Sequence, residues 1–342
     1  MSATKHFYVK SLSQKCLFVI AAISSGVVIL GCQPAVQTQS LEQAKTRIKS
    51  AALDRTGNSS LVNSLHEGVS LWNIPNQQRR LNWHHEDSSS PTITKAQIDL
   101  VALSLNGKYG ATASGQQVVT WSAQSGRSLG FTAMQAAVQC ISISEPEQQM
   151  LIGTTTTNAY LLSINQRVIL TSIELAQSPI VCALSNDGEF AAFGDQSGRF
   201  VIYRRSSKWQ LVQSIEHHAQ PSYVQFDIDS QMLLSASTND LVTVHALGER
   251  VPRWTQTLEH QSVTAAQLDY PWLVLGFDTH QVQVIDLSKS TTLFKAQIPK
   301  RPWYRSFFKN GPQHIMAVAL SGATLTVTSS EGSTHRLSIT SE

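Results

Sequence analysis

The chain has 342 residues, of which 14% are charged and 42% hydrophobic, and this length fits two ordinary domains or one large all-β domain. Three of its 26 basic residues precede residue 32, and the other 23 balance 23 acidic residues, which argues against nucleic-acid binding because that needs a basic face. The charged fraction is well below the roughly 25% of an average soluble protein. Ser, Thr and Gln make up the difference, so the composition favours a β-rich fold.

The first 31 residues have the organisation of a secretory signal. Lys5, Lys10 and Lys15 stand in a leader without acidic residues, and an uncharged apolar stretch follows, up to Cys32. The apolar run is about 15 residues long, which is short for a spanning helix, although an uncleaved N-terminal membrane anchor is the alternative. We therefore expect residues 1–31 to be a signal peptide that is removed.

Residues 29–32, Ile-Leu-Gly-Cys, resemble the lipobox of bacterial lipoproteins, with Leu30 where that family more often has a smaller residue. The resemblance implies transfer of diacylglycerol to the Cys32 thiol, cleavage just before it and acylation of the new amino group. Several acyl chains hold a protein at a bilayer far more firmly than one. Gln33 replaces the Asp that retains such proteins at the inner membrane, which implies the periplasmic side of the outer membrane. We expect residues 32–47 to be the lipidated N-terminus and a tether.

Three stretches share one order of strands and turns, namely an apolar strand, a Gly-containing turn, a small-residue strand, a tight turn and a third strand. They are residues 100–121, 182–204 and 304–328. The turn glycines Gly107, Gly188 and Gly311 are 81 and 123 residues apart, which are two and three units of about 41. The chain therefore contains a repeat of constant length.

Further units begin at residues 138, 222 and 263 and keep this spacing with Pro or Asp at the turn, residues that favour turns through a fixed φ or a local hydrogen bond. A seventh unit spans residues 48–74 and is followed by a polar loop at 84–95. A repeat of 40–45 residues with short strands indicates propeller blades, each buried only between two neighbours. We predict an all-β fold, a seven-bladed β-propeller of four-stranded antiparallel blades over residues 48–342, with six or eight blades as alternatives.

The segment His84, His85, Glu86 and Asp87 offers imidazole and carboxylate groups that suit a divalent metal. Adjacent residues seldom converge on one ion, so we interpret the segment as a solvated loop. The chain has no Gly-x-Ser-x-Gly elbow, no His-Glu-x-x-His helix and no phosphate loop. We therefore predict no catalytic residue, no metal and no cofactor, although propeller active sites gather single residues from several loops.

Two cysteines, Cys140 and Cys182, follow Cys32, too few for a disulfide framework. They fall in corresponding first strands of neighbouring repeats, one residue out of register when Ser144 is matched with Ser185. Because side chains alternate faces along a strand, we expect the two thiols to point opposite ways and to be buried and inert. A disulfide between them is the alternative.

Six residues recur at equivalent places in the repeats: Trp72 and Trp121 in third strands, His218 and His260 just before first strands, and Asp240 and Asp278 near second turns. These positions resemble those of WD40-repeat propellers, and the resemblance covers nearly all of the chain after the leader. In that family a Trp, a Ser or Thr, a His and an Asp form a buried hydrogen-bond network that stiffens a blade, which implies a structural role here. No repeat has the full set and the Trp-Asp dipeptide is absent, so related propellers of the YVTN type also fit.

The connection into the last unit holds Arg301, Trp303, Tyr304 and Arg305. Trp, Tyr and Arg are the residues enriched at binding hot spots, so we interpret this segment as a partner-binding surface. The competing interpretation is that Trp303 packs against the seventh blade while the arginines cover its edge.

The sequence as a whole predicts a monomeric propeller, held at the membrane by lipid, that binds other envelope proteins as a scaffold or assembly factor. This expectation rests on an analogy of fold, and it favours a binding protein over an enzyme. The alternative is a channel-mouth enzyme or small-ligand binder, such as a propeller lactonase or hydrolase.

Overall fold

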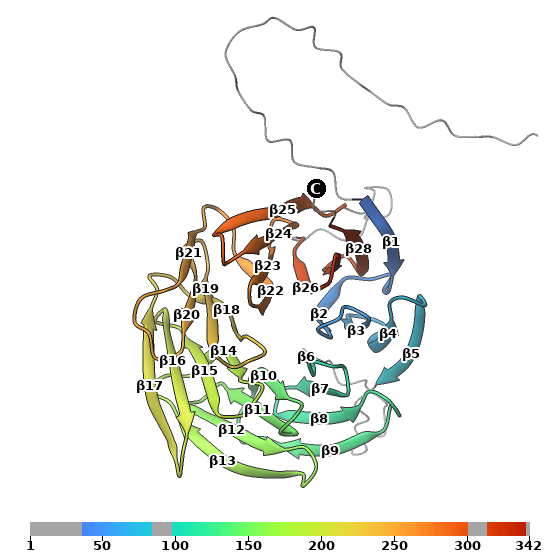
Figure 1. The fold of residues 1–342 in the computed structure, drawn as a ribbon. Coiled ribbons are helices and arrows are strands. Elements are labelled where there is room, and N and C mark those ends of the chain that lie inside the picture. Colours follow the sequence, from blue (N-terminus) through green and yellow to red (C-terminus); the bar gives the residue numbers. More distant parts are fainter. Residues whose placement is uncertain (1–35, 84–97, 300–312, 340–342) are drawn as a thin grey trace, which may run out of the picture. The chain divides into compact units, whose positions relative to one another are not determined.

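The computed structural model describes residues 36–83, 98–299 and 313–339. Over these ranges the regular secondary structure is entirely β, with 28 strands in seven four-stranded antiparallel sheets. The sheets are arranged around a common axis as the blades of a propeller (Figure 1). This confirms the predicted all-β fold and the blade number of seven.

Each of the first four blades is formed by four consecutive strands. Blade 1 has β2 (Ile48–Leu53), β3 (Ser59–Ser64), β4 (Gly68–Asn73) and β5 (Gln78–Trp83). Blade 2 has β6 (Leu100–Leu103), β7 (Tyr109–Ser114), β8 (Gln117–Ser122) and β9 (Ser128–Ala133). Blade 3 has β10 (Val138–Ser144), β11 (Gln149–Thr154), β12 (Asn158–Ser163) and β13 (Val168–Glu174). Blade 4 has β14 (Pro179–Leu184), β15 (Phe190–Asp195), β16 (Arg199–Arg205) and β17 (Trp209–Glu216).

The last three blades include the one that closes the ring. Blade 5 has β18 (Pro221–Phe226), β19 (Met232–Ser237), β20 (Leu241–Ala246) and β21 (Trp254–Thr257). Blade 6 has β22 (Val263–Asp269), β23 (Trp272–Phe277), β24 (Gln281–Asp286) and β25 (Thr291–Gln297). Blade 7 has β26 (Ile315–Ser321), β27 (Thr324–Ser329) and β28 (Ser333–Ser338), and its fourth strand is β1 (Val36–Glu42).

The first strand of every blade lies nearest the axis, and neighbouring first strands contact one another around the whole ring, including β26 with β2 (Figure 1). The first turn and the third connection of a blade lie at the same end, as the hydrogen bond from Leu287 N to Pro271 O (2.8 Å) shows in blade 6. We call this the turn end. The second turns and the connections between blades lie at the opposite end, the link end, where Ile298 N donates to His280 O (2.9 Å).

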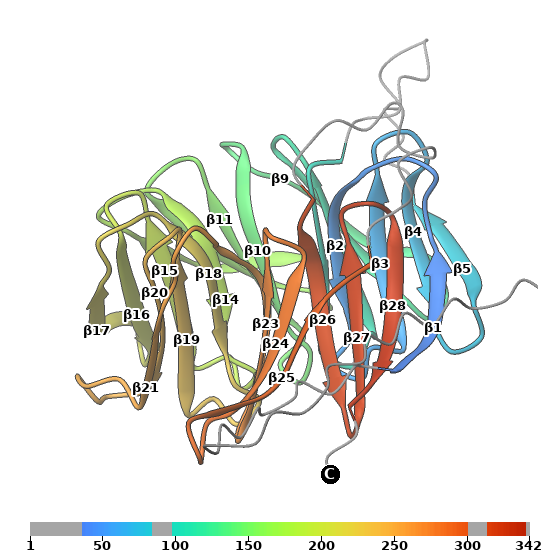
Figure 2. The ribbon, with the colours of Figure 1, turned by 90° about the horizontal axis from the view of Figure 1, so that it is seen from above.

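The ring is closed by pairing the first strand of the chain with the last. β1 runs antiparallel to β28, with Val36 opposite Ser338 and Glu42 opposite Ser333 (Figure 2). The predicted tether over residues 32–47 is therefore wrong for residues 36–42, which are part of the propeller. The propeller accordingly begins at β1 and not at residue 48.

The seventh blade also differs from its predicted register. The sequence predicts Gly311 in its first turn, but that turn lies at Gly322 (φ +56°), between β26 and β27. Gly311 falls outside the described residues. In contrast, Gly107 and Gly188 occupy first turns as predicted, with φ of +70° and +67°, values that glycine adopts without steric cost. The constant spacing fails at blade 7 because β25 and β26 are separated by a longer connection than the one between most blades.

The apolar core is divided into clusters that lie between neighbouring blades, because each sheet has two faces to bury. The largest joins blades 5 and 6 and includes Leu234, Leu275 and Phe277. The smallest lies beside blade 1 and consists of Ala44, Ile48 and Val62. The contact between blades 7 and 1 is instead largely polar: Thr334, Gln43, Ser60, Thr328 and Thr326 are buried there.

Candidate functional site

A central channel of about 540 Å³ runs between the seven first strands. Its wall is mixed in character, with small apolar residues such as Ala52, Ala102 and Ala266 beside polar ones such as Gln225. Tyr223 crosses between blades 5 and 6, where its hydroxyl donates to Ala266 O (3.0 Å). Burial raises the pKa of Tyr223, so this phenol stays protonated at neutral pH.

The turn end of the channel is organised by one polar side chain at the end of each of several first strands. Asp54 Oδ1 accepts from Asn58 N (2.8 Å), Ser104 Oγ from Tyr109 N (3.0 Å), Ser185 Oγ from Phe190 N (2.8 Å) and Asp227 Oδ1 from Met232 N (2.8 Å). Ser144 Oγ instead donates to Asn186 O of the next blade (2.7 Å). Burial raises the pKa of Asp227, although backbone N–H donors act in the opposite direction. These side chains hold the first turns in shape.

An ion pair spans the first turn of blade 7 from the two blades beside it. Arg55 of blade 1 donates to Asp269 Oδ2 of blade 6 through Nε (3.0 Å) and also through Nη2. The pair borders a hollow of about 270 Å³ that is also lined by Asn106, Trp272 and Gly322. The pair therefore adds a contact between blades 1 and 6 across the first turn of blade 7.

A hydrogen-bond network fills the link half of blade 5. His217 Nδ1 and Ser237 Oγ lie 2.5 Å apart, and His217 Nε2 lies 3.3 Å from Ser235 Oγ. Ser235 Oγ and Thr243 Oγ1 are 2.8 Å apart, and Thr243 Oγ1 is 3.3 Å from His245 Nδ1. All five side chains are buried. Burial lowers the pKa of His217 to about 4 and also lowers the pKa of His245, so both rings are neutral at pH 7.

The histidine in this network is not the one that the sequence predicts. His218 is exposed and takes part only through its backbone N–H, which donates to Asp240 Oδ2 (2.9 Å). His260 is exposed too, in a turn with φ +56°. Asp278 Oδ1 accepts from Ser262 N (3.0 Å). The two aspartates thus attach the second turn of a blade to the segment that enters its first strand, while neither predicted histidine is a buried ring.

The two predicted tryptophans lie in third strands and differ in their surroundings. Trp121 Nε1 donates to Thr112 Oγ1 of the neighbouring strand (2.8 Å), and its ring stacks on Trp83 of blade 1 with centroids 5.1 Å apart. Trp72 Nε1 donates to Ser70 Oγ within its own strand (2.8 Å). Trp121 therefore links two strands and two blades.

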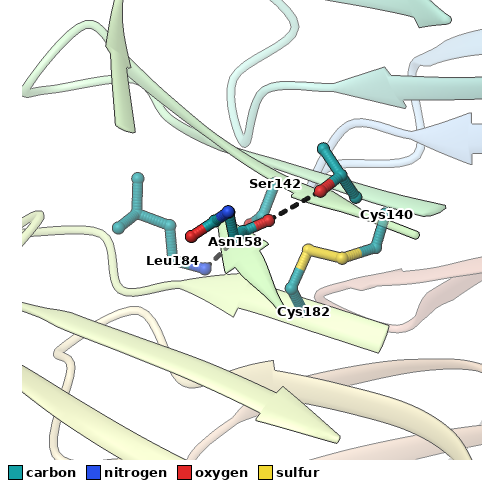
Figure 3. The surroundings of a disulfide bond; sticks show 6 residues. Cys140, Ser142, Asn158, Cys182 and Leu184 are labelled. Carbon is teal, nitrogen blue, oxygen red and sulfur yellow. Dashed lines mark hydrogen bonds between the residues drawn. A yellow bond between two sulfur atoms is a disulfide. The ribbon is translucent and has the colours of Figure 1, made fainter. Parts of the chain in front are cut away.

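Cys140 and Cys182 form a disulfide between blades 3 and 4, with Cα atoms 5.8 Å apart (Figure 3). The expectation of two separate, inert thiols is therefore wrong, and the alternative, a disulfide between them, is what the structure shows. Neighbouring blades meet through opposite faces of their first strands, so a one-residue offset brings the two side chains together. Close by, Leu184 N donates to Ser142 Oγ (3.0 Å), which adds a second contact between the blades (Figure 3).

The sequence analysis does not predict three features of the structure. They are the buried ring of His217, the polar side chains that hold the first turns, and Gly153 beside the disulfide. A Cβ on Gly153 would lie 2.5 Å from Cys140 Sγ and 2.9 Å from Pro179 Cγ, so a larger residue does not fit. The sequence does contain a pattern that indicates the polar residues at the ends of first strands. Ser104, Ser144 and Ser185 are 40 and 41 residues apart, which is the length of the repeat.

Several predicted residues fall outside the described ranges. They are Cys32, the segment His84, His85, Glu86 and Asp87, and the group Arg301, Trp303, Tyr304 and Arg305. Their roles stay predictions. Among the residues that the structure does describe, no three His, Cys, Asp or Glu side chains are grouped so as to hold a metal ion.

No protein-family model matches this chain, and no curated protein matches it either. What the fold defines is the class, a seven-bladed β-propeller of four-stranded blades. In the described part of the chain, no helix has the length and apolar character needed to cross a bilayer.

Proposed function

We propose that this chain is a WD40-like propeller lipoprotein, attached by lipid on Cys32 to the periplasmic side of the outer membrane, that binds other envelope proteins as a scaffold or assembly factor. The propeller is a rigid body with loops at both ends, which suits the binding of other proteins. The proposed location follows from the N-terminal signal and from the resemblance of residues 29–32 to a lipobox. The propeller type and the lipid attachment both rest on resemblance in sequence.

The Cys140–Cys182 disulfide supports the exported location. Disulfides persist in oxidising compartments such as the periplasm and are rare in a reducing cytoplasm. The disulfide and the signal-like leader in residues 1–31 therefore both favour export from the cytoplasm.

The observation that carries the binding role is the state of the ionisable side chains at the turn-end mouth of the channel. Asp54 and Asp227 accept backbone hydrogen bonds, and Arg55 and Asp269 bond to each other. These side chains are engaged within the protein, where they hold the loops of this end in shape. The loop surfaces are therefore the part of the described propeller best suited to recognition.

The binding role is tested with the variant Trp303→Ala/Arg305→Ala. We expect it to lose co-purification of an envelope protein from detergent-solubilised membranes while its Tm stays close to that of the wild type. Trp272→Ala/Arg250→Ala, which removes the same two residue types at the turn end, is the matched control and should retain the partner. A large fall in Tm with the partner retained would contradict the proposal and favour packing.

The location is tested with Cys32→Ser. We expect the wild-type protein to fractionate with the outer membrane and to carry the mass of acyl chains, and the variant to lose both properties. Wild-type protein without acyl mass would contradict the proposed anchor.

A second candidate role, small-ligand binding or channel-mouth catalysis, draws on the channel itself. Its volume of about 540 Å³ lies within the range of small-molecule sites. Elemental analysis and native mass spectrometry of the purified protein distinguish the two roles, because a stoichiometric metal or small molecule favours this second role and a stoichiometric protein partner favours the first.

A further inference from the structure

The direction of β1 fixes which end of the propeller the leader joins. Since β28 runs from the link end to the turn end and β1 is antiparallel to it, Val36 lies at the turn end, opposite Ser338. Both ends of the described chain thus leave blade 7 at the same end of the propeller.

Only Gln33, Pro34 and Ala35 separate Cys32 from β1. The four steps from Cys32 to Val36 span at most about 14 Å at full extension, whereas the seven residues of β1 extend over roughly 23 Å. A lipid on Cys32, as the proposed function has it, can therefore reach the bilayer only from near the turn end. The link end lies beyond its reach.

The turn end also carries exposed basic residues on its outer rim. One stands in the third connection of each of blades 2 to 6 and one near the start of β5 in blade 1. These six residues, which we call the basic rim, are Arg79, Arg127, Arg167, Lys208, Arg250 and Lys289. Most acidic residues of this end lie in first turns, nearer the axis, as Glu145 and Asp187 do. Two acidic residues lie on the rim itself: Glu249 pairs with Arg253, and Asp286 lies 3.6 Å from Lys289 Nζ. Basic residues close to a membrane are attracted by its anionic lipids.

Three exposed apolar side chains lie at the same end, in blades 5 and 6, whereas most of the other exposed apolar residues, such as Phe131 and Leu211, lie on the outer fourth strands. Tyr270 (51% exposed) and Trp272 (39%) flank the first turn of blade 6, and Val251 (75%) lies in the third connection of blade 5. Tyr and Trp favour the headgroup region of a bilayer, where the ring is apolar and the polar tip stays hydrated. Trp272 borders the same hollow as Gly322 of blade 7, the blade that the lipid-bearing segment enters.

We propose that the turn end lies against the bilayer, with the basic rim and the Tyr270–Trp272 turn on anionic phospholipid headgroups. This inference rests on the proposed lipid anchor. It turns the link end, with its second turns, toward the periplasm.

Two glutamines of blade 2 provide a matched pair for a test of this orientation. Gln124 lies in the third connection at the turn end and Gln116 in the second turn at the link end, and both are exposed. Gln124→Cys and Gln116→Cys each add one thiol for a fluorophore, because Cys140 and Cys182 are joined. The full lipidated protein is reconstituted in vesicles of phosphatidylethanolamine and phosphatidylglycerol that contain a headgroup quencher.

We expect severalfold stronger quenching at Gln124→Cys than at Gln116→Cys. Raising the phosphatidylglycerol fraction should increase the difference, and Arg127→Glu/Arg167→Glu should remove that increase. The control Lys45→Glu/Lys295→Glu, with the same change of charge outside the basic rim, should keep it. Equal quenching of the two labels in protein with acyl mass at Cys32, or stronger quenching at Gln116→Cys, would overturn the orientation alone. Absence of acyl mass would overturn the anchor and with it the orientation.

Discussion

His217 and His218 are adjacent in the chain, yet one ring is buried in a network and the other is exposed. The difference arises at the entry to β18, where the backbone N–H of His218 is held by Asp240 and the ring of His217 turns inward to Ser237. The resemblance to WD40 repeats predicts a histidine here, but one residue further along. A one-residue error is enough to exchange a buried side chain for an exposed one.

Burial of His217 makes stability depend on pH. Its pKa is lowered to about 4 in the folded protein, compared with about 6.5 for an unfolded histidine. The unfolded state therefore binds more protons between these values, so stability is full above about pH 6.5 and decreases as the pH falls toward 4. The pKa of His335 in β28 is lowered to about 4 as well, and it acts in the same window.

The variant His217→Gln should show a smaller loss of unfolding free energy between pH 6.5 and 4.5 than the wild type, because it removes one of the buried rings that titrate in this window. At pH 7 it should be less stable by about 1–3 kcal/mol, since network partners are left unpaired. Urea unfolding at both pH values measures the two effects. His218→Gln is the control and should match the wild type at each pH; an unchanged pH dependence in His217→Gln would contradict the assignment.

Gly153 occupies a place where no side chain fits. Gly153→Ala puts a Cβ against Cys140 Sγ and the Pro179 ring, and we expect a loss of about 1–3 kcal/mol from overpacking. Gly130→Ala, where the nearest atoms belong to the flexible Arg167 side chain, should cost much less. Urea unfolding of the two variants makes the comparison, and equal losses would show that the disulfide region can relax.

At the scale of elements, the closing contact between blades 7 and 1 differs from the other blade contacts. Its apolar cluster is small, and buried hydrogen bonds such as Thr334 Oγ1 to Gln43 Oε1 (2.6 Å) take its place. Hydrogen bonds contribute less net stability than the burial of a comparable apolar surface. The ladder between β1 and β28 therefore matters more to the ring than a single strand pair in another blade.

Removal of β1 should open this closure. A chain that begins at Gln43 should lose several kcal/mol of stability, a fall of about 10 °C in Tm, because β28 and the polar contact with blade 1 become exposed. A chain that begins at Pro34 keeps β1 and should melt like the mature protein. Equal Tm values for the two chains, measured by circular dichroism, would show that β1 is dispensable.

The disulfide between blades 3 and 4 joins residues 42 positions apart. Loop-closure entropy gives such a bridge about 4 kcal/mol of stabilisation, so Cys140→Ser/Cys182→Ser should lower the unfolding free energy by up to that amount. Dithiothreitol should lower the Tm of the wild type and leave that of the double variant unchanged. A wild-type Tm that does not respond to reduction, with reduction verified by thiol titration, would contradict a stabilising role.

At the scale of the whole molecule, the sequence predicts the repeat well and its exceptions poorly. Seven units follow from the spacing of first turns such as those at Gly107 and Gly188, because a local turn requires particular residues. The pairing of β1 with β28 cannot be predicted from the repeat. Residues 36–42 contain no turn residues that match it, and their partner strand is almost 300 positions away. The spacing predicts a first turn at Gly311 only because its distance from Gly188, 123 residues, is a multiple of the repeat.

The candidate site residues show the same limit. Trp121 could be placed in a third strand from the repeat alone, since its position is local. The Cys140–Cys182 bond depends on how two sheets face each other, and the Arg55–Asp269 pair depends on how the ring closes. Such contacts are set by the arrangement of blades, which a pattern within one blade does not contain.

The pairing of β1 with β28 also governs when the propeller can become complete. In a chain that crosses the membrane with its N-terminus first, as the proposed function has it, residue 36 emerges about 300 positions before residue 338. During this time the nascent ring has an open strand edge at each extremity, and such edges promote misassembly. Helper proteins that shield unfinished chains should therefore be needed until the final strand has emerged.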